Sequence, residues 1–288
     1  MQKPNSLDPE LPVEQVLGIV NKHINAHAVT DVEESGGEAR AYYIDTDIVL
    51  KVQRPNRVRK RTSLEQEVFF LKQLSSFSAI SIPQVFGYGR ETDSIEYIVM
   101  SRMSGKALKL VNTEKDKRDA LIFELGQMLF HIHNLPDKSN LTNSKLFPLD
   151  EDIESLKLRL LNPIHECAEV LSTKNSQWNL SASPVEIAKR ASDSFNFNES
   201  CTLHSNPGPT HTFINPQNQK LTGLIDFGDA YISHPSNDLR RFPDPKDRSV
   251  LFKGYNSLKK ANDDFMSVWV INQLTTNTAH GASGLSLC

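Results

Sequence analysis

The sequence has few cysteines, and they lie far apart. Cys167, Cys201 and Cys288 are the only three, and no two are close enough to form a cysteine-pair metal motif. Their odd number and wide spacing also argue against the disulfide framework of a small secreted protein. We therefore expect a protein of the reducing cytoplasm.

Long apolar runs and a strong net charge are also missing. No segment approaches the roughly 20 apolar residues that a membrane-spanning helix needs, and the opening segment MQKPNSLDPELP lacks the apolar stretch of a secretory signal. The net charge is only −3, which gives no electrostatic reason to expect binding to nucleic acid or to an anionic membrane. The sequence predicts neither partner, and nothing in it indicates an oligomeric state.

The 288 residues could form one large domain or two lobes, and the patterns change along the chain. Apolar residues at helical spacing predict a helix over 12–24, and Ser63 has the character of a helix N-cap. Between and after these helices the alternation favours strands at 29–34, 41–45, 47–52, 82–89 and 96–100. The first third is therefore predicted to be rich in strands, with 41–52 forming a hairpin.

The remainder is predicted to be mainly helical, with helices over 119–134, 151–171 and 184–196. This order suggests two lobes with a cleft between them and a boundary near residues 100–105. The last residues, 275–288, are small and polar, and we expect them to be disordered.

The stretch 203–238 carries the most chemical information. An apolar strand, LTGLIDFGD, ends in Asp226, and a carboxylate at the end of a buried strand is well placed to hold a metal ion. Upstream lies His204-Ser205-Asn206, and His211 follows five residues after Asn206.

This arrangement resembles the catalytic core of the kinase-like phosphotransferases, the family of aminoglycoside and macrolide phosphotransferases and choline kinase-like enzymes. Their core reads roughly HGD-x-x-x-x-N, then a strand, then D-[FW]-G, and the resemblance covers about Gly36 to Tyr255. It implies an α+β, two-lobed protein-kinase-like fold. A small antiparallel-sheet lobe, residues 1–103, would bind nucleotide, and a larger helical lobe, residues 104–288, would hold the catalytic loop, metal site and acceptor pocket.

The resemblance also implies a reaction, the transfer of the γ-phosphoryl group of ATP or GTP to a hydroxyl of a small molecule. An aminoglycoside-like compound or another metabolite would be the acceptor. Acidic residues in the region expected to form the acceptor pocket would suit a cationic amine, although an ordinary solvated helix face explains them equally well: Glu154, Glu166 and Glu169.

Nucleotide-binding residues follow from the same resemblance. Lys51, in Val-Leu-Lys-Val, would contact the phosphates and be fixed by a glutamate of the next helix, with Glu67 preferred to Glu65. The resemblance also assigns a turn over the phosphates to Gly36 and Gly37. Backbone groups between Ser101 and Met103 would bind the adenine edge.

Asp226 and His211 are the predicted metal ligands. Asp226 would hold Mg²⁺ against the nucleotide phosphates, and Asp238, in Pro-Ser-Asn-Asp-Leu, would brace the catalytic loop through backbone hydrogen bonds. His211 stands where the family often has asparagine and macrolide phosphotransferases have histidine. Imidazole is softer than an amide oxygen, so Mn²⁺ or Zn²⁺ suits this ligand better than Mg²⁺.

The catalytic loop departs from the family pattern. Its catalytic positions are His204 and Asn206, and Asn206 stands where the family has its catalytic aspartate. An amide oxygen can orient a hydroxyl but has essentially no basicity. Two interpretations stay open: a phosphotransferase weakened at its base, or a catalytically inactive pseudoenzyme that binds nucleotide or a partner protein.

Overall fold

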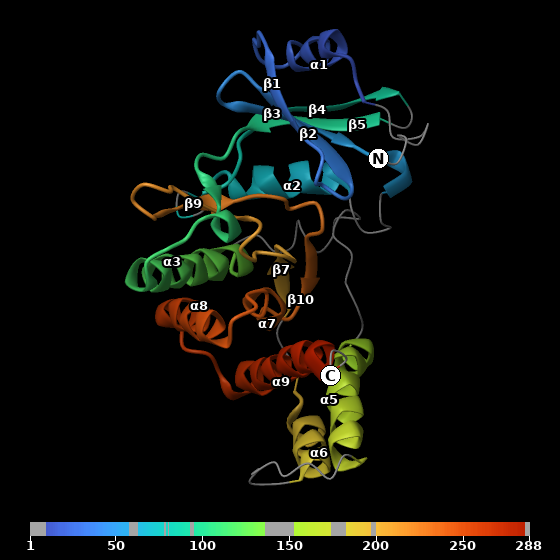
Figure 1. Cartoon of the computed structure of the whole chain (residues 1–288), viewed down its shortest axis with the longest axis vertical. Coiled ribbons are helices and arrows are strands. Elements are labelled where there is room, and N and C mark those ends of the chain that lie inside the picture. The colour runs from blue at the N-terminus through green and yellow to red at the C-terminus, as the bar shows by residue number, and fades with distance from the viewer. Residues whose placement is uncertain are drawn as a thin grey trace.

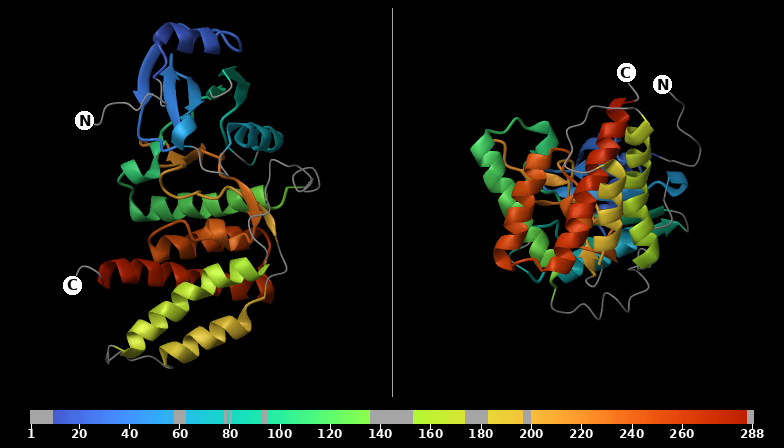
Figure 2. Two further views of the ribbon diagram at one scale, coloured as in Figure 1. Left: turned by 90° about the vertical axis from the view of Figure 1, so that its right-hand side faces the viewer. Right: turned by 90° about the horizontal axis from the view of Figure 1, so that it is seen from below.

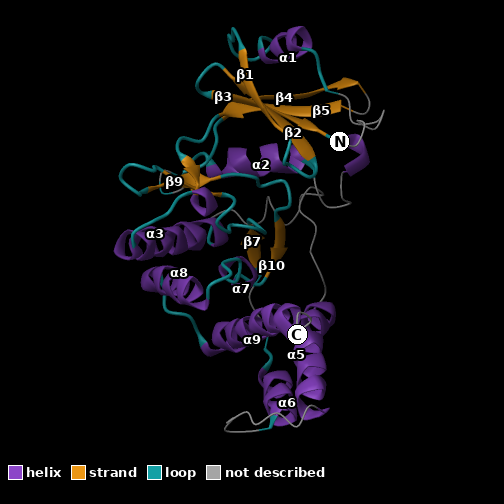
Figure 3. Ribbon diagram, viewed as in Figure 1, coloured by secondary structure: helices purple, strands orange, loops and turns teal. Residues whose placement is uncertain are grey.

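The computed structural model describes residues 10–57, 63–77, 79, 81–92, 95–135, 153–173, 183–196 and 200–285. They form two parts that follow one another along the long axis of the molecule, a sheet-rich N-terminal part and a helical C-terminal part (Figure 1). Colouring by secondary structure makes this segregation clear (Figure 3). The predicted α+β architecture, with an antiparallel-sheet N-terminal lobe and a helical C-terminal lobe, is confirmed.

The N-terminal lobe is built on one five-stranded antiparallel sheet with the strand order β1-β2-β3-β5-β4. Its strands are β1 (Val29–Glu33), β2 (Ala39–Ile44), β3 (Ile48–Gln53), β4 (Val85–Thr92) and β5 (Ile95–Ser101). The predicted hairpin is β2–β3, and Asp45 in its turn has the left-handed backbone conformation, with φ 48°. A short 3-10 helix, Pro55–Arg57, follows β3.

Two helices, α1 (Val13–Val20) and α2 (Leu64–Leu74), cover opposite faces of this sheet (Figure 1). Side chains alternate along a strand, so Leu50 of β3 packs with the α1 residues while Val49 packs with those of α2. Lys51 is two residues from Val49 and therefore lies on the α2 face. This register brings its ammonium group to the helix that carries Glu67.

Helix α1 ends at Val20, four residues before its predicted end. The side chain of Asn21 accepts a hydrogen bond from the Ala26 N–H at 2.9 Å and donates to the Ala26 carbonyl oxygen at 3.2 Å. Asparagine competes in this way with helical backbone hydrogen bonds, so the chain turns toward β1 at this point.

Helix α2 begins after the predicted N-cap, because the Ser63 hydroxyl accepts a hydrogen bond from the Gln66 N–H. Leu64, Val68 and Leu71 form its buried stripe, and Glu67 lies on the same stripe with only 1% of its side chain exposed. A carboxylate buried to this degree needs a cationic or hydrogen-bonding partner.

The C-terminal lobe is mainly helical, and two small sheets lie between its helices and the N-terminal lobe (Figure 1). The helices are α3 (Lys115–His133), α5 (Ile153–Thr173), α6 (Pro184–Ser194), α7 (Ser236–Leu239), α8 (Pro245–Leu258) and α9 (Asp263–Leu285), with a 3-10 helix at Leu108–Leu110. One sheet pairs β6 (Lys106–Ala107), β8 (Thr212–Ile214) and β9 (Leu221–Leu224), and the other pairs β7 (Cys201–Leu203) with β10 (Tyr231–Ser233). None of the described helices is long and apolar enough to cross a membrane.

The predicted disorder of 275–288 is wrong for most of that segment, since α9 continues to Leu285. The Thr275 side chain is buried and donates to the Leu160 carbonyl oxygen at 2.5 Å. This tertiary contact with α5 holds a polar sequence in a helix that composition alone does not favour. Helices α5, α6 and α9 pack together at the end of the molecule farthest from the large sheet (Figure 2).

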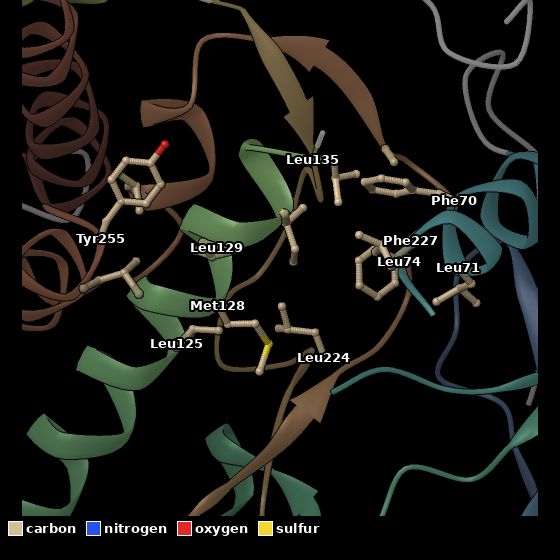
Figure 4. Packing of buried hydrophobic residues seen from close by; sticks show 14 of the residues in the cluster. Phe70, Leu71, Leu74, Leu125, Met128, Leu129, Leu135, Leu224, Phe227 and Tyr255 are labelled. Carbon is tan, nitrogen blue, oxygen red and sulfur yellow. The ribbon is translucent and has the colours of Figure 1, made fainter. Parts of the chain in front are cut away.

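A single hydrophobic cluster joins the lobes. It contains Phe70 and Leu74 of α2, Leu125 and Leu129 of α3, and Phe227 just after β9 (Figure 4). The Phe70 and Phe227 rings meet edge to face, with their centroids 5.7 Å apart. The residue before Phe227 is Asp226, so this packing fixes a carboxylate where the two lobes meet.

Candidate active site

The ammonium group of Lys51 lies between two carboxylates. Its Nζ is 2.7 Å from Glu67 Oε2 and 2.6 Å from Asp226 Oδ1. Glu65, the other glutamate considered, is exposed and forms an ion pair with Arg90 at 3.9 Å. Of the two glutamates, the structure therefore pairs Glu67 with Lys51. The direct contact between Lys51 and Asp226 was not predicted.

Electrostatics keep Lys51 and Asp226 charged, whereas burial raises the pKa of Glu67. Burial alone would lower the pKa of Lys51, but the carboxylates of Asp226 and Glu67 outweigh it and raise that pKa above its usual value. The Lys51 ammonium in turn holds the pKa of Asp226 well below its ordinary range. At neutral pH the ion pair of Lys51 with Asp226 is thus fully ionised.

Asp226 is held in an unusual backbone conformation. Its φ is 71°, in the left-handed region that only glycine adopts easily. Its neighbour Phe227 is fully buried and donates its N–H to Glu67 Oε1 at 3.2 Å. A backbone outlier of this kind costs roughly 1–3 kcal/mol and is common at functional sites. It directs a carboxylate with 44% of its side chain exposed away from the packed core.

The candidate catalytic loop is anchored by Asp238. One carboxylate oxygen accepts the His204 N–H and the other accepts the Ser205 N–H, both at 2.8 Å. His133, at the end of α3, lies with Nε2 3.0 Å from the same carboxylate and Nδ1 3.2 Å from the Tyr255 hydroxyl. Asp238 therefore braces the loop as the resemblance implied, and His133 has a structural place in that brace.

Both ring nitrogens of His204 are used by backbone groups. Nε2 lies 3.0 Å from the Ile225 carbonyl oxygen, so this nitrogen carries the proton, and Nδ1 accepts the Asn206 N–H at 3.2 Å. Burial lowers the pKa of His204 to about 4, which keeps the ring neutral. The ring connects the loop to the strand that precedes Asp226, an arrangement that favours positioning over proton transfer.

Asn206 and His211 lie at the open side of this loop. The Asn206 side chain is exposed and makes no hydrogen bond within the described ranges. The Asn206 carbonyl oxygen accepts a hydrogen bond from His211 Nδ1 at 2.8 Å, and His211 Nε2 lies 3.3 Å from Asp226 Oδ2. Ser205, just before Asn206, has a φ of 82° and is a second strained residue in the same site.

The geometry of His211 and Asp226 suits a cation. Because His211 Nδ1 donates to a carbonyl oxygen, a neutral ring turns the lone pair of Nε2 toward the Asp226 carboxylate. Two acceptors facing each other need a proton or a metal ion between them. Among the described residues no group of three histidine, cysteine or acidic side chains could hold a metal by itself. The pair therefore fits a divalent ion that takes its other ligands from phosphate and water.

Gly36 and Gly37 lie in the turn between β1 and β2. A Cβ on Gly36 would lie 2.4 Å from the carbonyl oxygen of Ala39, the first residue of β2, so glycine is needed there for close packing. Glu34, just before it, is ion-paired with Arg40 and Arg54. These ion pairs hold the turn against the neighbouring strands.

The predicted adenine-binding segment is partly occupied by the fold itself. The Ser101 N–H donates to the Gln84 carbonyl oxygen at 2.8 Å, and the Arg102 N–H donates to the Asp47 carbonyl oxygen at 2.6 Å. Of the three amides between Ser101 and Met103, that of Met103 is the one without such a partner in the described chain. The backbone groups of this segment that are left to bind an adenine edge are therefore the Met103 N–H and the carbonyl oxygens.

With this geometry in view, comparison with known proteins decides the family. A model of the phosphotransferase enzyme family (APH) matches residues 33–244, well over half of the chain. The chain belongs to this family. No curated protein sequence was found to match the chain.

Solved structures of phosphotransferases share the fold. The GDP complex of wild-type aminoglycoside 2'-phosphotransferase-IIIa has a TM-score of 0.63 at 17% identity, covering 95% of each chain. The streptomycin–ATP ternary complex of APH(2")-IIa has a TM-score of 0.58 at 19% identity, covering 92% of this chain and 91% of that one. Apo macrolide 2'-phosphotransferase MphH from Brachybacterium faecium has a TM-score of 0.62 at 15% identity, covering 96% and 93%. At these identities the likeness is one of fold.

Proposed function

We propose that this phosphotransferase-family protein transfers the γ-phosphoryl group of ATP or GTP to a hydroxyl of a small molecule. The observation that carries the proposal is the Lys51 ammonium, held by Glu67 and Asp226 at the junction of the two lobes. Nucleotide complexes among the solved structures of the same fold support a nucleotide donor. In this proposal residues 1–103 bind the nucleotide, and residues 104–288 supply the catalytic loop and the acceptor pocket.

Lys51 binds the phosphates of the donor, and Glu67 keeps its ammonium in place. The Gly36–Gly37 turn lets the backbone lie close to these phosphates, and the Met103 N–H together with the Ser101 carbonyl oxygen faces the base. His204 keeps the catalytic loop in register with Asp226 through its two backbone contacts. We expect the protein to act in the cytoplasm, where nucleoside triphosphates are available.

Asp226 and His211 would hold a divalent cation, Mg²⁺ or Mn²⁺. When bound, such an ion neutralises charge on the phosphate oxygens. The lone pair of His211 Nε2 and the exposed carboxylate of Asp226 are the groups available for it.

Asn206 orients the acceptor hydroxyl through its amide oxygen. The hydroxyl oxygen forms a bond to the γ-phosphorus, and the bond from that phosphorus to the leaving nucleoside diphosphate breaks, with the electron pair going to the diphosphate. The hydroxyl proton passes to water, since Asn206 has no basicity. Phosphoryl transfer depends mainly on positioning and charge stabilisation, so this route remains chemically sound without a base.

A second function, nucleotide binding without turnover, is favoured by Asn206 itself. Loss of a general base typically costs about 10²–10⁴ in rate. The exposed Asn206 amide makes no hydrogen bond in the described part of the loop. A protein that only binds nucleotide as a scaffold needs no general base at this position.

The test is to measure ATP and GTP binding and phosphate release with Mg²⁺ and with Mn²⁺, for the parent protein and for Asn206→Asp. Transfer or hydrolysis by the parent supports the first function. Binding by both proteins, with turnover only by Asn206→Asp, supports the scaffold. Absence of nucleotide binding in both proteins would contradict each of these functions and favour the partner-binding form of a pseudoenzyme.

A further inference from the structure

Three arginines gather around Tyr231 of β10. Arg240 and Arg241 directly follow α7, and Arg159 lies on α5. Burial and the Asp238 carboxylate raise the pKa of Tyr231, whereas the positive charges of all three arginines oppose that rise. Three cations from two distant parts of the sequence therefore lie close enough to the Tyr231 hydroxyl to lower its pKa.

This tyrosine adjoins the candidate catalytic loop. Tyr231 pairs with Leu203 across the β7–β10 ladder, and the loop starts at the residue after Leu203. On the other side, the backbone of Arg241 approaches Gly208: a Cβ built on Gly208 would lie 2.9 Å from the Arg241 carbonyl oxygen and 3.5 Å from Asn206 Oδ1. Arg241 and the Asn206 amide thus flank the same glycine.

Asp238, the carboxylate that acts on Tyr231 together with these cations, is already engaged by other groups. Asp238 already accepts the N–H groups of His204 and Ser205 and lies against His133. Arg159 and Arg240 have other interactions, so Arg241 is the deciding residue. Its Nε atom is buried and has no hydrogen-bond partner in the described part of the chain.

A buried guanidinium N–H without an acceptor is costly to the free protein and valuable to a ligand that supplies one. Guanidinium groups match carboxylate and phosphate oxygens in both charge and planar geometry. By contrast, the acidic residues that would suit a cationic acceptor are exposed on α5: Glu154, Glu166 and Glu169. Their carboxylates are solvated, while the Nε atom of Arg241 is buried and the backbone of Arg241 lies next to the catalytic loop.

We propose that the acceptor carries an anionic group, a carboxylate or a phosphate, in addition to its hydroxyl, and that Arg241 binds this group. The inference rests on the proposed function, because it names the acceptor class for the same site. It sets this chain apart from relatives such as the one solved with streptomycin, a cationic aminoglycoside.

The test is a binding measurement on the full chain saturated with a non-hydrolysable ATP analogue and Mg²⁺. Titration calorimetry compares two hydroxy anions, glycerate and glycerol 3-phosphate, with two hydroxy cations, ethanolamine and kanamycin, at constant ionic strength. The proteins are the parent, Arg241→Gln, Arg241→Lys and, as a matched control, Arg190→Gln on the exposed side of α6.

We expect at least one anion to bind more tightly than both cations, and the better anion identifies carboxylate or phosphate as the group recognised. Arg241→Gln should raise its Kd by roughly 10- to 100-fold, as expected for a lost charge-assisted hydrogen bond. Arg241→Lys should retain much of the affinity, and Arg190→Gln should leave it unchanged.

The inference is overturned if the cations bind at least as tightly as the anions, or if Arg241→Gln keeps its circular dichroism spectrum and the anion affinity of the parent. Binding of the ATP analogue is measured in the same samples and separates the two proposals. Its absence overturns the proposed function, whereas normal nucleotide binding without a preference for anions overturns only the inference about the acceptor.

Discussion

Lys51 and Asp226 lie 175 positions apart in the sequence, yet Lys51 Nζ is 2.6 Å from Asp226 Oδ1. The ion pair connects β3 of the N-terminal lobe to Asp226, two residues after the end of β9 in the C-terminal lobe. Glu67 holds the same ammonium from α2. The Lys51 ammonium thus links β3, α2 and the segment after β9. Four predictions concern the charges and hydrogen bonds of this site.

Glu67→Gln should weaken nucleotide binding. The change preserves the size of the side chain but removes its negative charge. Lys51 then keeps its ion pair with Asp226 but is less firmly held for phosphate contact. We expect the Kd for an ATP analogue with Mg²⁺ to rise about tenfold or more, since hydrogen bonds to charged groups contribute about 1.5–3 kcal/mol. Glu65→Gln is the control on the exposed side of α2, and an equal effect of the two changes would contradict the assignment.

His211→Asn should change the metal preference of nucleotide binding. Replacing a softer imidazole nitrogen with an amide oxygen favours Mg²⁺ over Mn²⁺. We expect the ratio of Mg²⁺-supported to Mn²⁺-supported affinity to rise about tenfold, equivalent to about 1.4 kcal/mol. Asp226→Asn should weaken binding with both ions. Identical metal dependence in the parent and His211→Asn would remove His211 from the metal site.

Asp238→Asn should destabilise the fold. The asparagine keeps one acceptor oxygen, while its amide group faces a backbone N–H that also needs an acceptor. The expected loss of unfolding free energy is about 3 kcal/mol or more, because a buried network is broken. Urea unfolding measures it, with Asp193→Asn on exposed α6 as the control. Unchanged stability in Asp238→Asn would show that the loop is held by other means.

Stability should decrease below neutral pH because of buried histidines. Burial lowers the pKa of His204 to about 4 and that of His234 to about 3, whereas an unfolded histidine titrates near about 6.5. Between these values the unfolded chain binds more protons than the folded chain, so the unfolding free energy falls as the pH is lowered. His204 alone should account for roughly 2 kcal/mol between about pH 7.5 and about pH 5.

Urea titrations at these two pH values check this expectation. His204→Gln should reduce the dependence of stability on pH, even if it lowers stability at both values. His165→Gln, at an exposed position on α5, should leave the dependence as in the parent. An unaltered pH dependence in His204→Gln would assign the effect to other groups.

The sequence predicted those parts of the site that depend on local periodicity. The apolar strand before Asp226 is such a part. The pairing of Lys51 with Glu67 was predicted from the resemblance to the phosphotransferase family, and the alternation along β3 and the helical stripe of α2 explain it. The contacts of Asp226 with Lys51 and of His133 with Asp238 were not predicted, because a polar contact between distant segments leaves no periodic pattern. The wrong prediction for 275–288 has a related cause: Thr275 is buried by α5, and composition carries no record of that partner.

The brace at Asp238 also has a consequence for biosynthesis. Asp238 follows His133 by 105 residues and His204 by 34, so the loop is translated well before the carboxylate that organises it. Until that residue emerges from the ribosome, the amides of His204 and Ser205 lack their acceptor. Nascent chains that stop shortly before Asp238 would therefore carry the whole N-terminal sheet but no ordered catalytic loop. Order in this loop would then appear abruptly, late in translation.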